Sequence, residues 1–100
     1  MRLTIIPIDG AVYKNEISFS GLDLSFIPAN IHALQWYETE GEIEFINNPD
    51  KTKPQNQTIT SLPEWALLAL TKWEEAKEVL EAAMKKVATT NQPTTGLETA

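Results

Sequence analysis

The chain has 100 residues, of which 42% are hydrophobic, and a formal net charge of −6 from 14 acidic and 8 basic residues. This is the size and composition of one small globular domain. The absence of cysteine excludes disulfides, thiolate metal sites and thiol nucleophiles. No apolar run approaches the roughly 18 residues of a membrane span. Binding to nucleic acid would need clustered Lys and Arg, and this acidic chain has no such cluster. We therefore expect neither a membrane nor a nucleic-acid partner, and we expect no signal peptide.

Short β-type runs fill the first part of the chain. Residues 3–6, 11–13 and 17–19 are rich in Ile, Val, Tyr and Phe, and Asn15 tolerates the left-handed backbone of a tight hairpin turn. Residues 22–27 precede a proline, which favours extended geometry before it. We expect a hairpin over residues 11–19, followed by a loop with inward-pointing Leu and Phe side chains.

A second hairpin is predicted over residues 31–45, which read IHALQWYETEGEIEF. Alternation along a strand places His32, Leu34 and Trp36 on one face. In the second strand Ile43 and Phe45 share a face, opposite the glutamates. One apolar and one polar face are typical of an antiparallel sheet that is covered on one side only. The polar residues 47–57 that follow are expected to form an exposed, mobile loop.

The third feature is a long amphipathic helix. Ser61 and Glu64 form a capping-box pattern, and Pro63 suits a first helical turn. Apolar residues then recur at steps of three and four, at Leu62, Ala66, Ala69, Trp73, Ala76, Leu80, Ala83 and Val87. The prediction is an α+β fold in a single domain, 1–88, with a small antiparallel β-sheet of two hairpins (3–60) covered on one face by a long C-terminal α-helix (62–88). Residues 89–100 are expected to form a disordered tail.

The helix is too long for the sheet. Its length would be roughly 39 Å at 1.5 Å per residue, against about 17–20 Å for a typical strand. Its second half should therefore overhang, with Leu80, Ala83, Met84 and Val87 exposed. Exposed apolar stripes on helices pair with a partner helix, from a second copy or from another protein. These four residues are the predicted partner-binding site.

The residues that could carry chemistry are few. His32 is the only histidine, and no serine has the context of a nucleophile. Glu38, Glu40, Glu42 and Glu44 alternate, but same-face neighbours on a strand are about 7 Å apart, too far to share a calcium ion. The four glycines stand singly, so no phosphate-binding loop exists. We expect no catalytic residue, no metal site and no cofactor.

Three segments resemble small proteins from the tail modules of bacteriophages and prophages, including the XkdW-like family and tail-fibre assembly or accessory proteins. They read IIPIDGAVYKN, SGLDLSFIPANIHALQWYETEGEIEF and SLPEWALLALTKWEEA, and the resemblance covers roughly residues 4–75. It implies a small α+β protein without catalytic residues that is associated with the phage tail or its assembly. It also implies a location in the host cytoplasm during assembly or in the virion tail.

Two functions stay open. The first is a tail-fibre assembly or accessory factor that binds a structural phage protein or self-associates through the distal helix. The alternative is a phage-encoded acidic inhibitor of a host protein, with the glutamates at 38–44 mimicking nucleic acid. An enzyme is disfavoured by the single His and the absence of Cys and of a phosphate loop.

Overall fold

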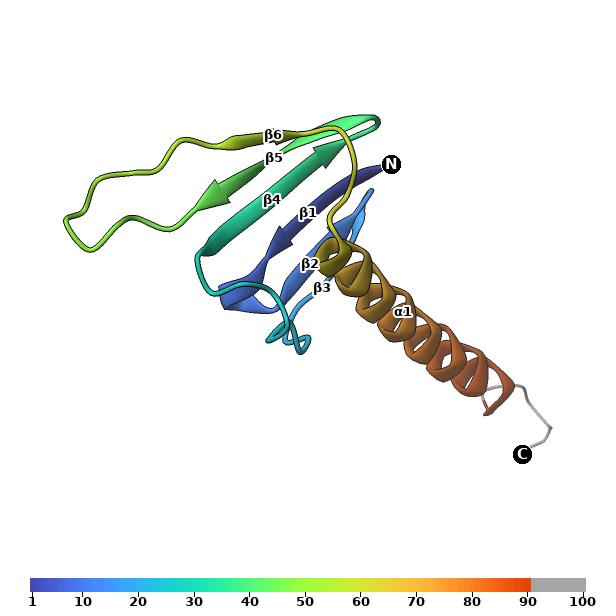
Figure 1. The fold of residues 1–100 in the computed structure, drawn as a ribbon. Coiled ribbons are helices and arrows are strands. Elements are labelled where there is room, and N and C mark those ends of the chain that lie inside the picture. The colour runs from blue at the N-terminus through green and yellow to red at the C-terminus, as the bar shows by residue number, and fades with distance from the viewer. Residues whose placement is uncertain (91–100) are drawn as a thin grey trace.

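The computed structural model describes residues 1–90, with side chains through residue 85. Its strands form one antiparallel sheet in the order β3-β2-β1-β4-β5-β6, and one helix follows them (Figure 1). The α+β fold with a C-terminal helix on one face of an antiparallel sheet is thereby confirmed. The elements are β1 (Arg2–Ile6), the 3-10 turn η1 (Pro7–Asp9), β2 (Ala11–Lys14), β3 (Ile17–Phe19), β4 (Ile31–Tyr37), β5 (Glu40–Phe45), β6 (Gln57–Ile59) and α1 (Glu64–Thr90).

The first strand lies at the centre of the sheet. β1 pairs with β2 on one side and with β4 on the other. Two turns hold its beginning. The backbone N–H of Asn15 donates to the Arg2 carbonyl at 2.7 Å, and that of Glu38 donates to the Met1 carbonyl at 2.9 Å. Asn15 and Glu38 both have the left-handed backbone of tight turns, with φ of 55° and 59°, as expected for Asn15.

The segment 20–30 carries the chain from the β3 edge to the far side of β1. Its Leu24 and Ile27 are buried in the core, and Phe26 packs against them partly buried. The N–H of Leu22 donates to the carbonyl of Gly10 at 3.0 Å, which attaches the segment to the end of η1. The predicted loop with inward apolar anchors is confirmed.

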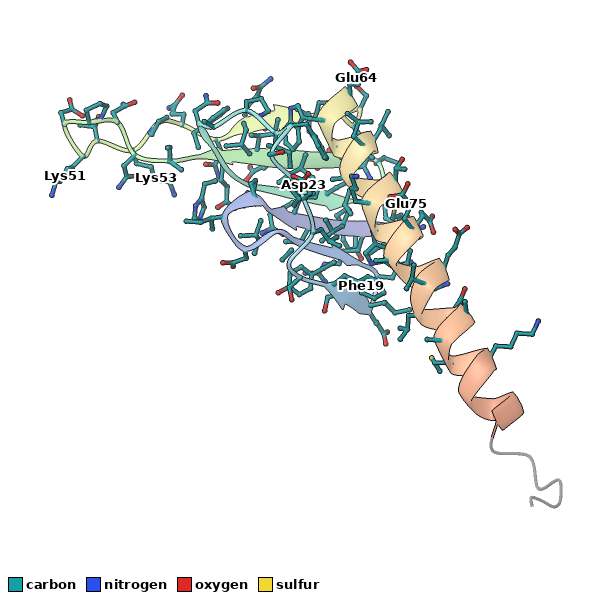
Figure 2. All side chains as sticks on the ribbon, turned by 90° about the horizontal axis from the view of Figure 1, so that it is seen from below. Phe19, Asp23, Lys51, Lys53, Glu64 and Glu75 are labelled. Atoms are coloured by element: carbon teal, nitrogen blue, oxygen red, sulfur yellow. The ribbon has the colours of Figure 1, made fainter. Side chains whose placement is uncertain are left out.

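One face of the sheet is covered and the other is open. Leu3, Ile5, Val12 and Leu34 are fully buried on the covered face, beneath α1 and the segment 20–30. The alternate residues of the same strands form the outer face, where no helix lies (Figures 1 and 2). The pairing of Leu34 with Ile43 on the covered face is as predicted.

The predicted position of His32 on the apolar face is wrong. The pairing of β4 with β5 shifts between Ile31 and Ala33, where a β-bulge breaks the two-residue period. Ile31 therefore takes the buried place and is 8% exposed, and His32 is exposed. Simple alternation could not reveal this shift, because it assumes a regular strand.

The helix begins two residues later than predicted. α1 begins at Glu64, and the N–H groups of Ala66 and Leu67 donate to the Pro63 carbonyl at 2.9 and 3.2 Å. Within the described part of the chain, Ser61 forms no hydrogen bond, so the capping box is not made. The helix continues to Thr90, two residues beyond the predicted end, and the rest of the predicted tail, 91–100, lies outside the described residues.

Only the first half of α1 touches the sheet. It packs mainly against β2 and β3. Within this half Ala66 and Ala69 are completely buried and Trp73 is 3% exposed. From residue 78 to residue 85 every residue is exposed. Both views show this half projecting away from the sheet (Figures 1 and 2). Residues 1–90 contain no helix with the length and apolar character needed to cross a membrane.

Candidate protein-binding surface

The projecting half of α1 exposes the apolar residues that were predicted to bind a partner. Leu80 is 45% exposed and Met84 61% exposed, and Ala83 is exposed beside them. We name Leu80, Ala83 and Met84 the distal stripe. The side chain of Val87, the fourth predicted residue, lies outside the described side chains.

The distal stripe continues the face that is buried in the first half of the helix. At 3.6 residues per turn, Leu80 and Met84 lie within about 20° of Trp73 around the helix axis. The stripe therefore has the direction and composition of a core-facing surface, but no sheet lies beneath it. A partner that covers it would extend the core of the domain.

Val79, which the sequence reasoning missed, enlarges this surface. It is 70% exposed, the highest value among the large apolar residues of α1 up to residue 85. The sequence could have indicated this, because Val79 precedes Ala83 by four residues and i,i+4 residues are neighbours on a helix. The exposed apolar surface is thus wider than a single line of residues.

Trp73 fixes the point at which the helix leaves the sheet. Its indole N–H donates to the carbonyl of Ile17 in β3 at 3.0 Å, and its ring meets Phe19 edge-on with centroids 5.9 Å apart. The ammonium groups of Lys14 and Lys77 lie 4.9 and 5.7 Å from the ring centroid. These contacts come from β2, β3 and α1, so they set the direction of the projecting half.

The glutamates of the alternating series at 38–44 do not form a metal site among the described residues. Glu38 lies in a turn with its carboxylate 3.2 Å from the Met1 ammonium group. Glu42 accepts a hydrogen bond from the Asn56 amide at 3.2 Å. Glu40 and Glu44 lie on the same outer face of β5. Among the side chains of residues 1–85, no group of His, Asp or Glu could hold a metal ion.

The open face of the sheet holds two shallow hollows of about 340 and 330 Å³. Arg2 and Gln35 line both of them. The guanidinium of Arg2 lies 5.8 Å from the centroid of the Tyr37 ring, and the Thr4 hydroxyl donates to the Gln35 side-chain oxygen at 2.8 Å. These polar groups bond with each other, and they do not converge on a common point as ligand-binding groups do.

Two carboxylates outside the strands have lowered pKa values. The Ser25 hydroxyl and N–H donate to Asp23 at 2.7 and 3.1 Å, and the Thr52 hydroxyl and N–H donate to Asp50 at 2.6 and 3.0 Å. Donation to the charged form lowers the pKa of each carboxyl group. Both are local turn bonds that close a loop, and neither faces a cleft.

His32 lines a shallow surface hollow of about 290 Å³ with Glu44 and Lys53. It has no hydrogen-bond partner among the described residues, and no serine lies next to it in that hollow. The loop after β5, with its tip closed by the bond from the Asn48 N–H to the Thr52 carbonyl at 2.8 Å, is exposed as predicted. Its mobility stays a prediction.

Comparison of the chain with protein-family models, with curated proteins and with solved structures gives no match. The likeness to phage tail-module proteins therefore stays a prediction, and functional proposals depend on the surfaces described above.

Proposed function

We propose that this chain is a non-catalytic bacteriophage tail-associated protein, an assembly or accessory factor that binds a structural phage protein such as the tail fibre. The observation that supports it best is the distal stripe, an exposed apolar surface on a projecting helix. Its site of action would be the host cytoplasm during phage assembly, and the virion tail if it stays with its partner.

The energetics of the helix favour a binding role. Isolated helices shorter than about 12–15 residues are marginal in water, and packing of an apolar face is what stabilises most helices in proteins. Residues 78–85 of α1 have no such packing. Full burial of a Leu or Met side chain is worth about 1.5–3 kcal/mol of transfer free energy. Leu80 and Met84 are already partly buried, so covering their remaining exposed surface with a partner would gain only a part of that free energy.

A co-purification experiment tests this proposal. The chain is co-expressed with a bacteriophage tail-fibre protein, and the yield of complex and of fibre trimer is measured. We expect Leu80→Glu to lower complex formation at least tenfold. Leu67→Glu is the matched control. Leu67 is also an exposed leucine of α1, 50% exposed against 45% for Leu80, but it lies in the half of the helix that packs on the sheet. The proposal fails if no complex forms, or if both variants lower it equally.

The acidic row on β5 supports a second candidate, an inhibitor of a host nucleic-acid-binding protein. Glu40, Glu42 and Glu44 share the outer face of the sheet, which no helix covers. Displacement of DNA from purified basic host proteins measures this activity. It should fall sharply when all three glutamates are changed to glutamine, and an absence of displacement by the unaltered chain would end this idea.

A further inference from the structure

We infer that the distal stripe of one copy packs antiparallel against the distal stripe of a second copy, with Leu80 of each helix opposite Ala83 of the other. The inference uses the same surface as the proposed function and rests on that surface being a docking site. The dimer would be the form of the free chain, and a structural partner would replace the second copy.

The spacing of large and small residues supports this arrangement. Trp73 and Leu80 are seven residues apart, and so are the alanines Ala69, Ala76 and Ala83. Over residues 69–83 this face of the helix is thus a heptad pattern whose two apolar positions differ in size, one large and one alanine, and Leu80 and Ala83 are its exposed members. Such a pattern fits a partner that presents alanine opposite each large side chain.

A second copy in antiparallel orientation presents that partner surface. In an antiparallel pair the large apolar position of one helix faces the alanine position of the other. Leu80 of each copy therefore meets Ala83 of the other copy, at two symmetry-related contacts. Parallel helices in register would place Leu80 against Leu80 and Ala83 against Ala83, which leaves a void in every second layer. Cores pack at high density when large and small residues face each other.

The geometry of the chain allows the pairing. The stretch from residue 78 to residue 90 is about 20 Å long at 1.5 Å per residue. It projects from the sheet, and its side chains at 78–85 are exposed (Figure 2). A two-fold axis near residues 81–82 places the two sheets at opposite ends of the helix pair. The interface is isologous, as in most homodimers, and Val79 and Met84 border the two central layers.

The small size of the stripe predicts a weak dimer. Stable interfaces bury about 800 Å² per partner, and a helix stretch of this length offers less. We expect association to depend on concentration in the micromolar to millimolar range. Weak association would also let a structural partner exchange with the second copy.

Sedimentation equilibrium of the full chain tests both the pairing and its packing. We expect a monomer–dimer equilibrium that Leu80→Glu abolishes and that Leu67→Glu leaves within twofold. Ala83→Leu is the decisive variant: a leucine there would collide with Leu80 of the other copy and raise the dissociation constant at least tenfold. If the stripe associates without this register, added apolar surface would instead tighten the dimer, and the inference would be wrong.

Crosslinking tests the orientation, because the chain has no cysteine of its own. In the antiparallel pair the two Ala76 positions are about 17 Å apart along the helix axis, whereas disulfides need Cα atoms within about 7 Å. Ala76→Cys should therefore stay uncrosslinked, and an equal mixture of the Leu80→Cys and Ala83→Cys chains should form a disulfide-linked dimer. Efficient crosslinking of Ala76→Cys would overturn the inference. A chain that is still monomeric at about 1 mM, the upper end of the expected concentration range, would also overturn it.

The two proposals fail separately. A fibre complex that forms with a strictly monomeric chain would support the proposed function and contradict the dimer. A dimer with the expected response to Ala83→Leu, in a chain that binds no structural phage protein, would do the reverse. Far-UV circular dichroism of each variant confirms that the sheet and helix are intact, since every substituted residue except Ala76 is exposed.

Discussion

Two glycines with the same backbone conformation should respond very differently to alanine. Gly10 and Gly21 both have left-handed backbones, with φ of 59° and 71°. A Cβ atom on Gly10 would lie 2.5 Å from the carbonyl oxygen of Leu22 and 2.9 Å from its nitrogen, whereas a Cβ atom on Gly21 meets nothing within 4 Å. Gly21→Ala is therefore the matched control for Gly10→Ala.

The difference in stability can be estimated from these contacts. Both substitutions carry the left-handed penalty of roughly 1–2 kcal/mol, which is partly offset by the lower entropy of the unfolded chain. Gly10→Ala must also move the backbone of Leu22, which breaks the bond between the Leu22 N–H and the Gly10 carbonyl. That bond is worth about 1 kcal/mol. The shift also loosens Leu24, which is buried, so we expect about 3–4 kcal/mol in total for Gly10 and about 1 kcal/mol for Gly21.

Urea denaturation followed by far-UV circular dichroism measures both losses. Equal slopes for the two variants would show that the midpoints report stability alone. If Gly10→Ala is no more destabilising than Gly21→Ala, the segment 20–30 is not fixed against η1 as the hydrogen bonds require. The same result would mean that the bond from the Leu22 N–H to the Gly10 carbonyl does not hold Leu24 and Ile27 in the core.

Two further predictions concern the helix anchor and the loop tip. Trp73→Phe should destabilise the fold by about 2 kcal/mol, because it removes the bond to the Ile17 carbonyl and part of a buried ring. Trp65→Phe is the control, since Trp65 is only partly buried and its indole N–H has no hydrogen-bond partner among the described residues. It should cost less than about 1 kcal/mol in the same denaturation assay. In an NMR titration of the carboxyl group, Asp50 should have a pKa below its ordinary value of 3.8. A lowered pKa in the folded state stabilises the turn above the ordinary pKa, and this contribution is lost as the pH falls through the folded value. Thr52→Ala should return the pKa toward 3.8, and an unchanged value would contradict the hydrogen-bond explanation.

Local pattern in the sequence was sufficient for the hairpin and the helix. Leu34 and Trp36 alternate with polar residues, and their partner strand does the same around Ile43, so both the hairpin and its covered face could be predicted. The exposure of Leu80 and Met84 could also be predicted, because it requires only a comparison of helix length with strand length.

Long-range pairing and local irregularity could not be predicted in this way. The pairing of β1 with β4 joins residues 29 to 35 positions apart, and no turn between them sets the register. The bulge that exposes His32 changes the period of the strand by one residue, without Gly or Pro to mark it. The direction of the projecting helix depends on the contacts of Trp73 with Ile17 and Phe19, which exist only after β3 is in place.

The composition of the helix face changes where the sheet ends, and this change argues for a second packing partner. Ala66 and Ala69 are small residues that let the helix axis approach the sheet closely, and Trp73 is the last buried side chain of this face among the described residues, bonded to Ile17 of β3. If the overhang had no partner, polar residues at the next positions would cost nothing, yet the chain has Leu80 and Met84 there. Leu80→Lys should therefore leave the free energy of unfolding of the monomer within about 0.5 kcal/mol, as for other surface substitutions, while abolishing whatever association the stripe supports. A loss of monomer stability above about 1 kcal/mol, twice the effect of an ordinary surface substitution, would mean that Leu80 already packs within its own chain.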